Sequence, residues 1–187
     1  MIPAVRTVAL AVLFLSLAAP ALAAQKRMVS YDAASPTAKR LTGAGLTFVF
    51  TKSLMRTRIY AVRATAVAVG IVPHPSTDGA VNRKLDALMG DHAGGGALYS
   101  IDPTAQEGRI MIAAFCPGST KGWLSIGQLG SRRDIKVFAF GDDPATGEPR
   151  LCGEMDFTFH GEWRMPPPIN DAVTDRVFAP DYGRPGS

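Results

Sequence analysis

The sequence lacks several features that would place it in a common class. It has no internal repeat and no glycine-x-serine-x-glycine motif, so a repeat array and the most familiar serine-hydrolase signature are excluded. Beyond the first two dozen residues, no uncharged run is long enough to cross a bilayer. Cysteine is scarce, with two residues in 187, so at most one internal disulfide can form. The remaining composition is that of a globular protein with a core.

The first residues have the three parts of a secretory signal. Arg6 gives a positive start, residues 8–19 form an uncharged apolar core, and residues 21–23 (ALA) make a small-x-small cleavage site. We therefore interpret residues 1–23 as a signal peptide. The mature chain is expected to be extracytoplasmic, in the periplasm or secreted, and not membrane-spanning. No cysteine lies near the cleavage point, so we expect no lipid anchor.

Residues 24–165 have the length of one globular domain, which we expect to be β-rich. Residues 166–187 begin with three prolines and predict an extended, proline-rich tail. The two cysteines, Cys116 and Cys152, are expected to pair in an oxidising compartment. Such a disulfide would stabilise the fold by about 4 kcal/mol in the chain-entropy model. Free or metal-binding thiols are the alternative.

Alternation of apolar and polar residues predicts mainly strands. We expect strands over residues 46–52, 58–69, 97–101, 109–115, 122–126, 135–140 and 150–163. The last two flank PATGE, which predicts a hairpin in which Gly147 adopts a positive φ. Residues 24–34 are polar and aperiodic, which indicates a loosely held leader.

Two helices are expected. A short one begins at Ser35-Pro36 and ends before Gly43, and a longer one runs to Gly90 with Thr77 or Asp78 as its cap. The fold class is therefore mainly β: an antiparallel β-sandwich or curved sheet of about seven strands with one or two short helices.

Residues 151–163, LCGEMDFTFHGEW, predict a strand with two different faces. One face carries Leu151, Met155, Phe157, Phe159 and Trp163, and the other carries Cys152, Glu154, Asp156, His160 and Glu162. A bulge at Gly153 would instead turn Cys152 toward the aromatic side chains.

Glu154, Asp156 and His160 are the weak catalytic candidates. Carboxylates about 7 Å apart could serve as acid and base, and a carboxylate with a histidine could hold a metal ion. Glu154 and His160 lie about 20 Å apart along a strand, too far for one ion to bridge. We favour the alternative that this face is simply solvated.

Two further groups could hold a metal ion. Asp142, Asp143 and Glu148 lie in one turn and offer the oxygen ligands that calcium accepts, but not in the spacing of the helix-loop-helix motif. His74 and His92 could approach His160 in the fold to form a zinc site. Acidic hairpin tips and exposed histidines are the simpler interpretations, and we expect no cofactor.

Charge is divided unevenly along the chain. Residues 24–90 hold ten Lys or Arg and three Asp, whereas residues 91–187 hold nine Lys or Arg and thirteen Asp or Glu. Arg56, Arg58 and Tyr60 are the candidates for contact with an anion or glycan. Because successive side chains of a strand point to opposite faces, Arg63 is expected on the face opposite Arg56 and Arg58. We expect strands from the two halves to interleave in one sheet and mix these charges; the alternative is a separate basic face.

The sequence favours an exported, non-catalytic binding or structural module of the cell envelope, stabilised by one disulfide. Its partner would be an envelope or extracellular protein, a glycan or an anionic surface; the compartment disfavours nucleic acid. One alternative is a small hydrolytic or metal-dependent extracytoplasmic enzyme that uses Glu154, Asp156 and His160. Another is an inhibitor or assembly factor that acts through the C-terminal tail.

Overall fold

The structure of the protein is a computed structural model that describes residues 25–53, 56–67 and 69–165. The predicted signal peptide and proline-rich tail lie outside these residues. The strands are β1 Arg27–Ala33, β2 Gly45–Lys52, β3 Thr57–Ala64, β4 Gly70–Ile71, β5 His74–Pro75, β6 Gly96–Ile101, β7 Gly122–Gly127, β8 Ile135–Asp142 and β9 Pro149–Arg164. The helices are α1 Pro36–Thr42, α2 Gly79–Met89 and α3 Gln106–Phe115, with a 3₁₀ turn, η1, at Gly90–His92.

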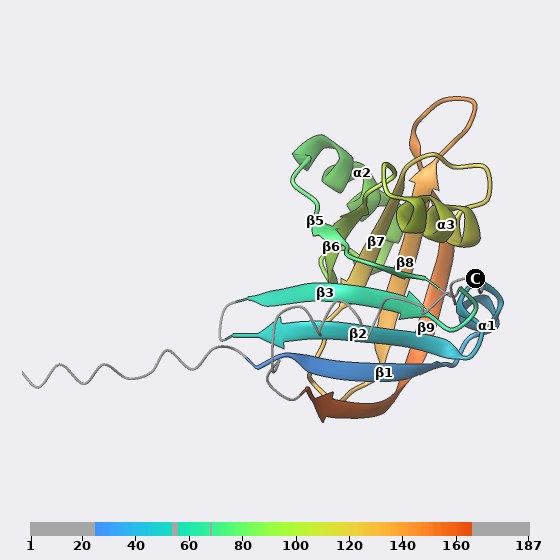
Figure 1. Cartoon of the computed structure of the whole chain (residues 1–187). Helices are drawn as coiled ribbons and strands as arrows, with labels where there is room; N and C mark the ends of the chain where they lie inside the picture. The colour runs from blue at the N-terminus through green and yellow to red at the C-terminus, as the bar shows by residue number, and fades with distance from the viewer. Residues whose placement is uncertain (1–24, 54–55, 68, 166–187) are drawn as a thin grey trace, which may run out of the picture.

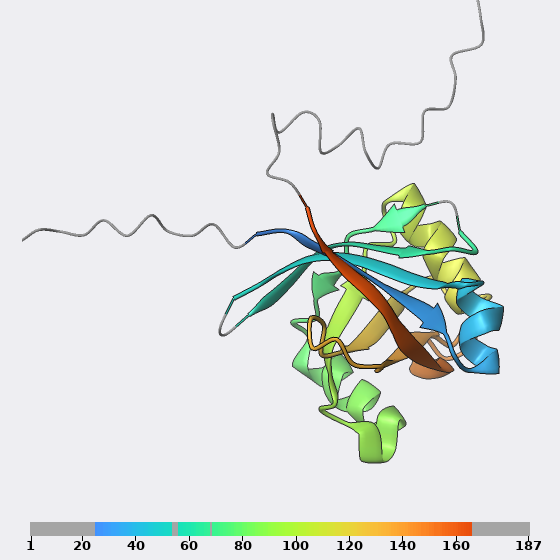
Figure 2. The same cartoon turned by 90° about the horizontal axis from the view of Figure 1, so that it is seen from below.

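All nine strands of the described ranges belong to one antiparallel sheet, in the order β4-β3-β2-β1-β9-β8-β7-β6-β5. The sheet curls, so that β1, β2 and β3 run across the direction of β6, β7 and β8 (Figure 1). β9 has 16 residues and pairs with β1 on one side and β8 on the other; Figure 2 shows it crossing between the two halves. The expected curved antiparallel sheet with few short helices is confirmed, with nine strands and three helices in place of seven and one or two.

The inner face of the curled sheet holds the main core. Aromatic and aliphatic side chains from both halves meet there, and α1 and α3 add to them. Representative buried members are Tyr31, Phe48, Phe50, Ile112, Phe115, Val137 and Phe157. A smaller cluster on the outer face packs Leu85 and Met89 of α2 against Phe138 and Phe140 of β8. Each buried aliphatic or aromatic side chain contributes about 1.5–3 kcal/mol, so both faces of β8 stabilise the fold.

The prediction of a loose leader over residues 24–34 is wrong. Residues 27–33 form β1, which lies between β2 and β9 in the interior of the sheet. Val29 and Tyr31 alternate into the core and are 0% and 1% exposed. Two apolar residues at a spacing of two are too weak a pattern to identify a strand, but β2 and β9 supply hydrogen-bonding partners on both edges.

The prediction of a strand over residues 109–115 is also wrong, because these residues lie in α3. The alternation of Ile110 and Ile112 favoured a strand, yet Ile110 is among the exposed large apolar residues. The buried residues of the helix are Gly108, Met111, Ile112 and Phe115. Their spacing of three, one and three is helical. A side chain at Gly108 would collide with the carbonyl oxygen of Asp102, so only glycine lets the helix approach the preceding turn.

The predicted strand over residues 58–69 ends early, at Ala64. The chain then turns, and β4 pairs with β3 through Val62–Ile71 and Arg63–Gly70. Thr65 fixes the turn because its hydroxyl donates to the carbonyl of Thr42 at 2.6 Å. This hydroxyl also accepts from the backbone N–H of Gly45 at 3.0 Å.

The predicted helix boundaries are confirmed. Ser35 caps α1 by accepting from the N–H of Ala38 at 3.2 Å. Asp78, rather than Thr77, caps α2 by accepting from the N–H groups of Ala80 and Val81. The predicted β8–β9 hairpin forms, and Gly147 in its turn has a φ of 72°.

Two bulges in β9 reverse which side chains face inward. The register against β8 shifts between Gly153 and Leu151, and the register against β1 shifts between Gly161 and Phe159. Beyond these shifts, Leu151 and Trp163 are 39% and 45% exposed. The prediction that Leu151 and Trp163 lie on the apolar face is therefore wrong, because the extra residue in each bulge inverts the alternation of inward and outward side chains.

Candidate functional site

The predicted catalytic candidates Glu154 and Asp156 meet a lysine from the neighbouring strand. On the outer face of the sheet, Lys136 of β8 forms ion pairs with both, at 3.2 Å from Asp156 Oδ1. The hydrogen bond to Glu154 holds the pKa of Lys136 above its ordinary value, outweighing the opposing effect of burial, and Asp156 acts in the same direction. Lys136 therefore stays cationic, and neither carboxylate is a free base.

His92 of η1 approaches this ion-pair group from the side of α2. Its Nε2 lies 3.9 Å from Glu154 Oε1. Its ring centroid lies 5.7 Å from that of Phe138, which is buried under α2 and η1. No local pattern places His92 beside Glu154, because they are far apart along the chain and only the packing of α2 on β8 brings them together.

His160, the third predicted catalytic candidate, lies in a different place. It is the extra residue of the second bulge, and its Nδ1 lies 2.9 Å from Asp32 Oδ2 on β1. Its ring packs 6.2 Å from that of Trp163. The structure therefore brings Glu154 and Asp156 together but separates both from His160.

The predicted calcium ligands have separate roles in the structure. Asp142 accepts from the backbone and hydroxyl of Thr120 and from the N–H of Lys121, all within 2.7 Å. Asp143 caps its own turn at the N–H groups of Ala145 and Thr146. Glu148 forms an ion pair with Lys84 of α2. These three carboxylates are thus not arranged around one point.

Nor do the three histidines converge. His74 is exposed in β5, whereas His92 and His160 have the separate acidic neighbours described above. Across the parts of the chain that the structure describes, no group of three or more His, Cys, Asp or Glu side chains is placed to hold a metal ion.

The predicted disulfide between Cys116 and Cys152 is present, with the Cα atoms 5.4 Å apart. Cys116 does not lie on a strand: it caps the end of α3, and its N–H donates to Ile112. Cys152 is the extra residue of the first bulge in β9. The bond therefore joins α3 to β9 beside the core, as the bulge alternative in the sequence implied.

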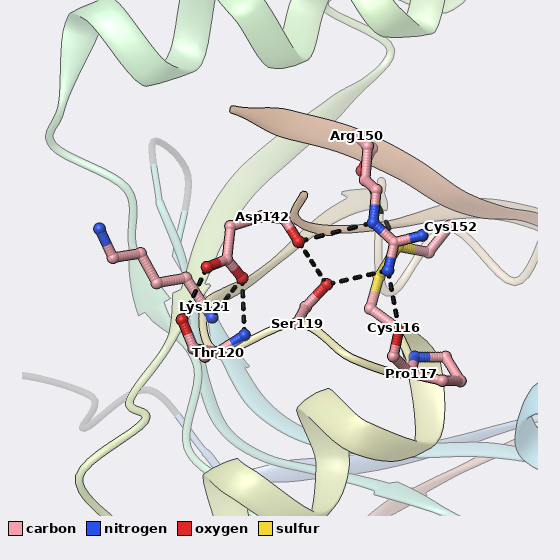
Figure 3. Close-up of a disulfide and its surroundings, with 8 residues drawn as sticks. All are labelled: Cys116, Pro117, Ser119, Thr120, Lys121, Asp142, Arg150 and Cys152. Atoms are coloured by element: carbon pink, nitrogen blue, oxygen red, sulfur yellow. Dashed lines mark hydrogen bonds between the residues drawn. A yellow bond between two sulfur atoms is a disulfide. The ribbon is translucent and has the colours of Figure 1, made fainter. Parts of the chain in front are cut away.

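Polar contacts surround the disulfide (Figure 3). The Arg150 guanidinium donates to the carbonyl of Pro117 at 2.8 Å and to the Ser119 hydroxyl at 3.2 Å. The Ser119 hydroxyl in turn donates to the carbonyl of Asp142 at 2.7 Å. Asp142 is buried, which opposes its ionisation, but the hydrogen bonds from Lys121 and Thr120 outweigh burial and lower its pKa. This network holds the turn after α3 and is structural.

The predicted anion-contact residues lie on β3 and just before it. Two cations approach the ring of Tyr60, with Lys26 Nζ 5.0 Å and the Arg58 guanidinium carbon 5.2 Å from the ring centroid. Both distances allow a cation–π interaction. Arg56 is exposed ahead of the strand, where its backbone bonds to Ser53. The sequence pattern missed Lys26, which reaches Tyr60 from the position just before β1.

A bulge in β3 places Arg63 on the same face of the strand as Arg58. The register between β2 and β3 shifts at Tyr60, so that Ile59 and Val62 both face the core, at 5% and 0% exposure. Arg58 and Arg63 are consequently both exposed. The parity prediction that placed Arg63 on the opposite side is wrong. We define the basic face as Lys26, Arg58, Tyr60 and Arg63.

The expected interleaving of the two charge-biased halves occurs only in part: β5 pairs with β6 at one edge of the sheet, and α2 packs on β8. β1, β2, β3 and β4 are contiguous in the sheet, and the C-terminal strands follow them as one block with β9 at the boundary. Eight of the ten Lys and Arg of residues 24–90 therefore belong to β1 to β4 and the segments that adjoin or connect them, whereas Arg83 and Lys84 lie on α2 in the other half of the molecule. Among the described residues, Lys26, Arg58 and Arg63 take part in no ion pair.

Fold and surface together define a disulfide-linked, mainly β protein with a curled antiparallel sheet and a segregated basic side. In the residues that the structure describes, no helix has both the length and the apolar character needed to cross a membrane. No protein-family model matches the chain, and comparison with curated proteins and with solved structures gave no match.

Proposed function

We propose that this protein is an exported, non-catalytic binding module of the cell envelope, and that its basic face contacts an anionic component there. The N-terminal signal pattern and the disulfide support export. The observation that carries the binding proposal is the contiguity of β1, β2, β3 and β4, which keeps Lys26, Arg58 and Arg63 in one half of the sheet without ion-pair partners among the described residues.

The chemistry of the basic face favours phosphate, sulfate or carboxylate groups. A guanidinium offers paired donors that match the oxygens of such groups, and the lysine adds a compact charge. Tyr60 holds Lys26 and Arg58 close together, because the negative face of its ring offsets part of their repulsion. A face held in this way loses less side-chain freedom on binding than two isolated long side chains would.

The enzyme alternative has less support. Its three residues are divided between two places, and Lys136 forms ion pairs with both Glu154 and Asp156. Acid–base chemistry needs a group that can exchange a proton near neutral pH. A lysine with a raised pKa does not meet this need, and both carboxylates are engaged by that lysine.

The experiment measures binding of the mature protein to two sources of anionic groups. One is heparin, a soluble sulfated glycan; the other is a phosphatidylcholine vesicle that contains phosphatidylglycerol. We expect saturable binding to at least one of them at low salt, weakened strongly by 0.5 M NaCl because exposed charges are screened beyond about 4–5 Å at that ionic strength. Binding to heparin alone would identify a glycan and binding to vesicles alone a lipid headgroup. Binding to neither at low salt would contradict the proposal.

A further inference from the structure

A cleft on the outer face of the sheet has no role in the function proposed above. Its volume is about 380 Å³, within the range of small-molecule sites. The floor comes from β7 and β8, and the walls come from the glycine-rich loop after η1 and from the loop between β7 and β8. The cleft lies beside the Lys136 ion-pair group, on the side of the sheet that α2 covers in part.

Ser125 gives the cleft an unsatisfied polar group. It is 2% exposed, and its hydroxyl makes no hydrogen bond within the residues that the structure describes. The Ser125 hydroxyl keeps some accessible surface, because it is not among the fully buried side-chain polar atoms that lack a partner. Within the described residues, Tyr31 Oη alone is such an atom. Ser125 therefore offers a donor and an acceptor to a group bound in the cleft.

The charges that line the cleft cancel. Asp91 and Asp134 contribute two negative charges, and Arg133 and Lys136 contribute two positive charges. Lys136 is moreover paired with Glu154 and Asp156 just outside. With these two carboxylates included, the surroundings carry more negative than positive charge and disfavour an anion, while the mixed lining of the cleft itself suits a neutral polar ligand.

The hydrogen-bonding groups of the lining suit hydroxyls. Ser125, Gln128 and Ser131 can each donate and accept, as a sugar hydroxyl does. His92 and Phe138 add an apolar ring surface. Gly95, Gly96 and Gly127 carry no side chain, so the ligand can approach the backbone closely.

We propose that this cleft binds a neutral saccharide unit, with Ser125 and Gln128 as hydrogen-bonding residues. The site is independent of the basic face, because it lies on the C-terminal half of the sheet. It can therefore fail or succeed separately from the function proposed above.

The test titrates the isotopically labelled mature protein with glucose, galactose, N-acetylglucosamine and maltose up to tens of millimolar and follows backbone amide shifts. We expect at least one of these sugars to shift amides of residues 93–96 and 125–128 saturably. Ser125→Ala and Gln128→Ala should each weaken that binding about ten-fold, the effect of one lost hydrogen bond. Ser30→Ala, on the other half of the sheet, is the matched control and should leave it unchanged.

Gln128 is exposed in a loop, so its variant keeps the test valid if Ser125→Ala perturbs the fold. Three results would overturn the assignment: no sugar shifts these amides, the shifts occur but neither cleft variant weakens them, or only charged probes such as phosphate and acetate produce them.

Discussion

Tyr31 places a phenol in the core without a hydrogen-bonding partner. The residue is 1% exposed, and its hydroxyl is unpaired among the described residues. Its ring packs edge-on against Phe48 and Phe159, at centroid distances of 5.9 and 6.0 Å. Burial raises the pKa of Tyr31 to about 12, with smaller contributions from the nearby carboxylates of Glu162 and Asp134. The ring stabilises the core, whereas the hydroxyl opposes its own burial.

Tyr31→Phe is expected to increase the free energy of unfolding at pH 7 by about 1 kcal/mol, since it removes an unsatisfied buried hydroxyl and keeps the ring. In the unfolded chain the phenol ionises near its ordinary pKa of 10.0, but in the folded protein its pKa is about 12. Wild-type stability should therefore fall as the pH rises from 10 to 12, and the variant should fall less. Urea unfolding across this range measures both effects.

The control is Tyr60→Phe, because the Tyr60 side chain is only half-buried. This variant should change the free energy of unfolding by less than about 0.5 kcal/mol.

Asp142 is a second residue whose ionisation is coupled to folding. Burial opposes its ionisation, but donors from Lys121 and Thr120 outweigh burial and lower its pKa in the folded protein. The unfolded chain therefore binds a proton at higher pH than the folded protein does. The stability that Asp142 contributes is complete above its ordinary pKa and is lost as the pH falls through the lower, folded value.

Asp142→Asn is expected to reduce the free energy of unfolding at pH 7 by about 1.5–3 kcal/mol, the usual worth of hydrogen bonds to a charged group. The difference from wild type should begin to shrink as the pH falls below about 4, where the unfolded wild-type chain takes up the proton, and should be lost only below the lowered pKa of the folded carboxylate. Urea unfolding between pH 7 and pH 3 gives this comparison. A difference that stays constant over the whole range would show that the charge of Asp142 is not involved.

At the scale of the elements, the disulfide ties a helix to the longest strand. It closes a loop with a sequence separation of 36 between the end of α3 and the bulge of β9. Ser119, Arg150 and Asp142 hold the same junction without it. The bond therefore acts mainly on the unfolded chain, whose freedom it restricts.

The Cys116→Ser/Cys152→Ser double variant is expected to lose about 4 kcal/mol of unfolding free energy. Denaturant unfolding of wild type with and without reductant should show the same loss. The double variant is its own control, because reductant should not affect it. If wild type unfolds at the same denaturant concentration in both conditions, α3 and β9 are held together without any help from the disulfide.

The success of sequence interpretation also differs from one element to another. Caps and turns were predictable, because Ser35, Asp78 and Gly147 act through contacts with their own neighbours in the chain. α3 was misassigned because Ile110 and Ile112 alternate as in a strand, and only the packing selects the helical set. β1 was missed because its stability comes from the two strands that flank it.

The candidate surfaces were harder to predict from the sequence than the caps and turns, because they depend on contacts between distant strands. The bulges of β9 and β3 are visible only in the register with neighbouring strands, yet they decide where Leu151, Trp163 and Arg63 point. Pairing of Lys136 with Glu154 could not be predicted, since strand register sets it. Arg58 and Tyr60 were identified from local sequence, and their partner Lys26 was not.

For the whole molecule, strand order determines the electrostatics. β1, β2, β3 and β4 form one block of the sheet, so most of the uneven division of charge along the chain becomes an uneven division in space. Had the halves interleaved, the same composition would have given a mixed surface. The basic face is therefore a property of topology as much as of sequence, and anion binding by this face is the central claim.

The most direct test compares two double variants that lose the same charge. Lys26→Gln/Arg58→Gln removes two cations from the basic face, and Arg83→Gln/Lys121→Gln removes two from the other half of the molecule. Because each basic residue near an anionic surface is worth about 1 kcal/mol, the first pair should weaken binding to the anionic vesicle or heparin about 30-fold at low salt. The second pair should weaken it only slightly, through net charge. Equal weakening by the two pairs would mean that net charge alone drives binding, and it would contradict the assignment of the basic face.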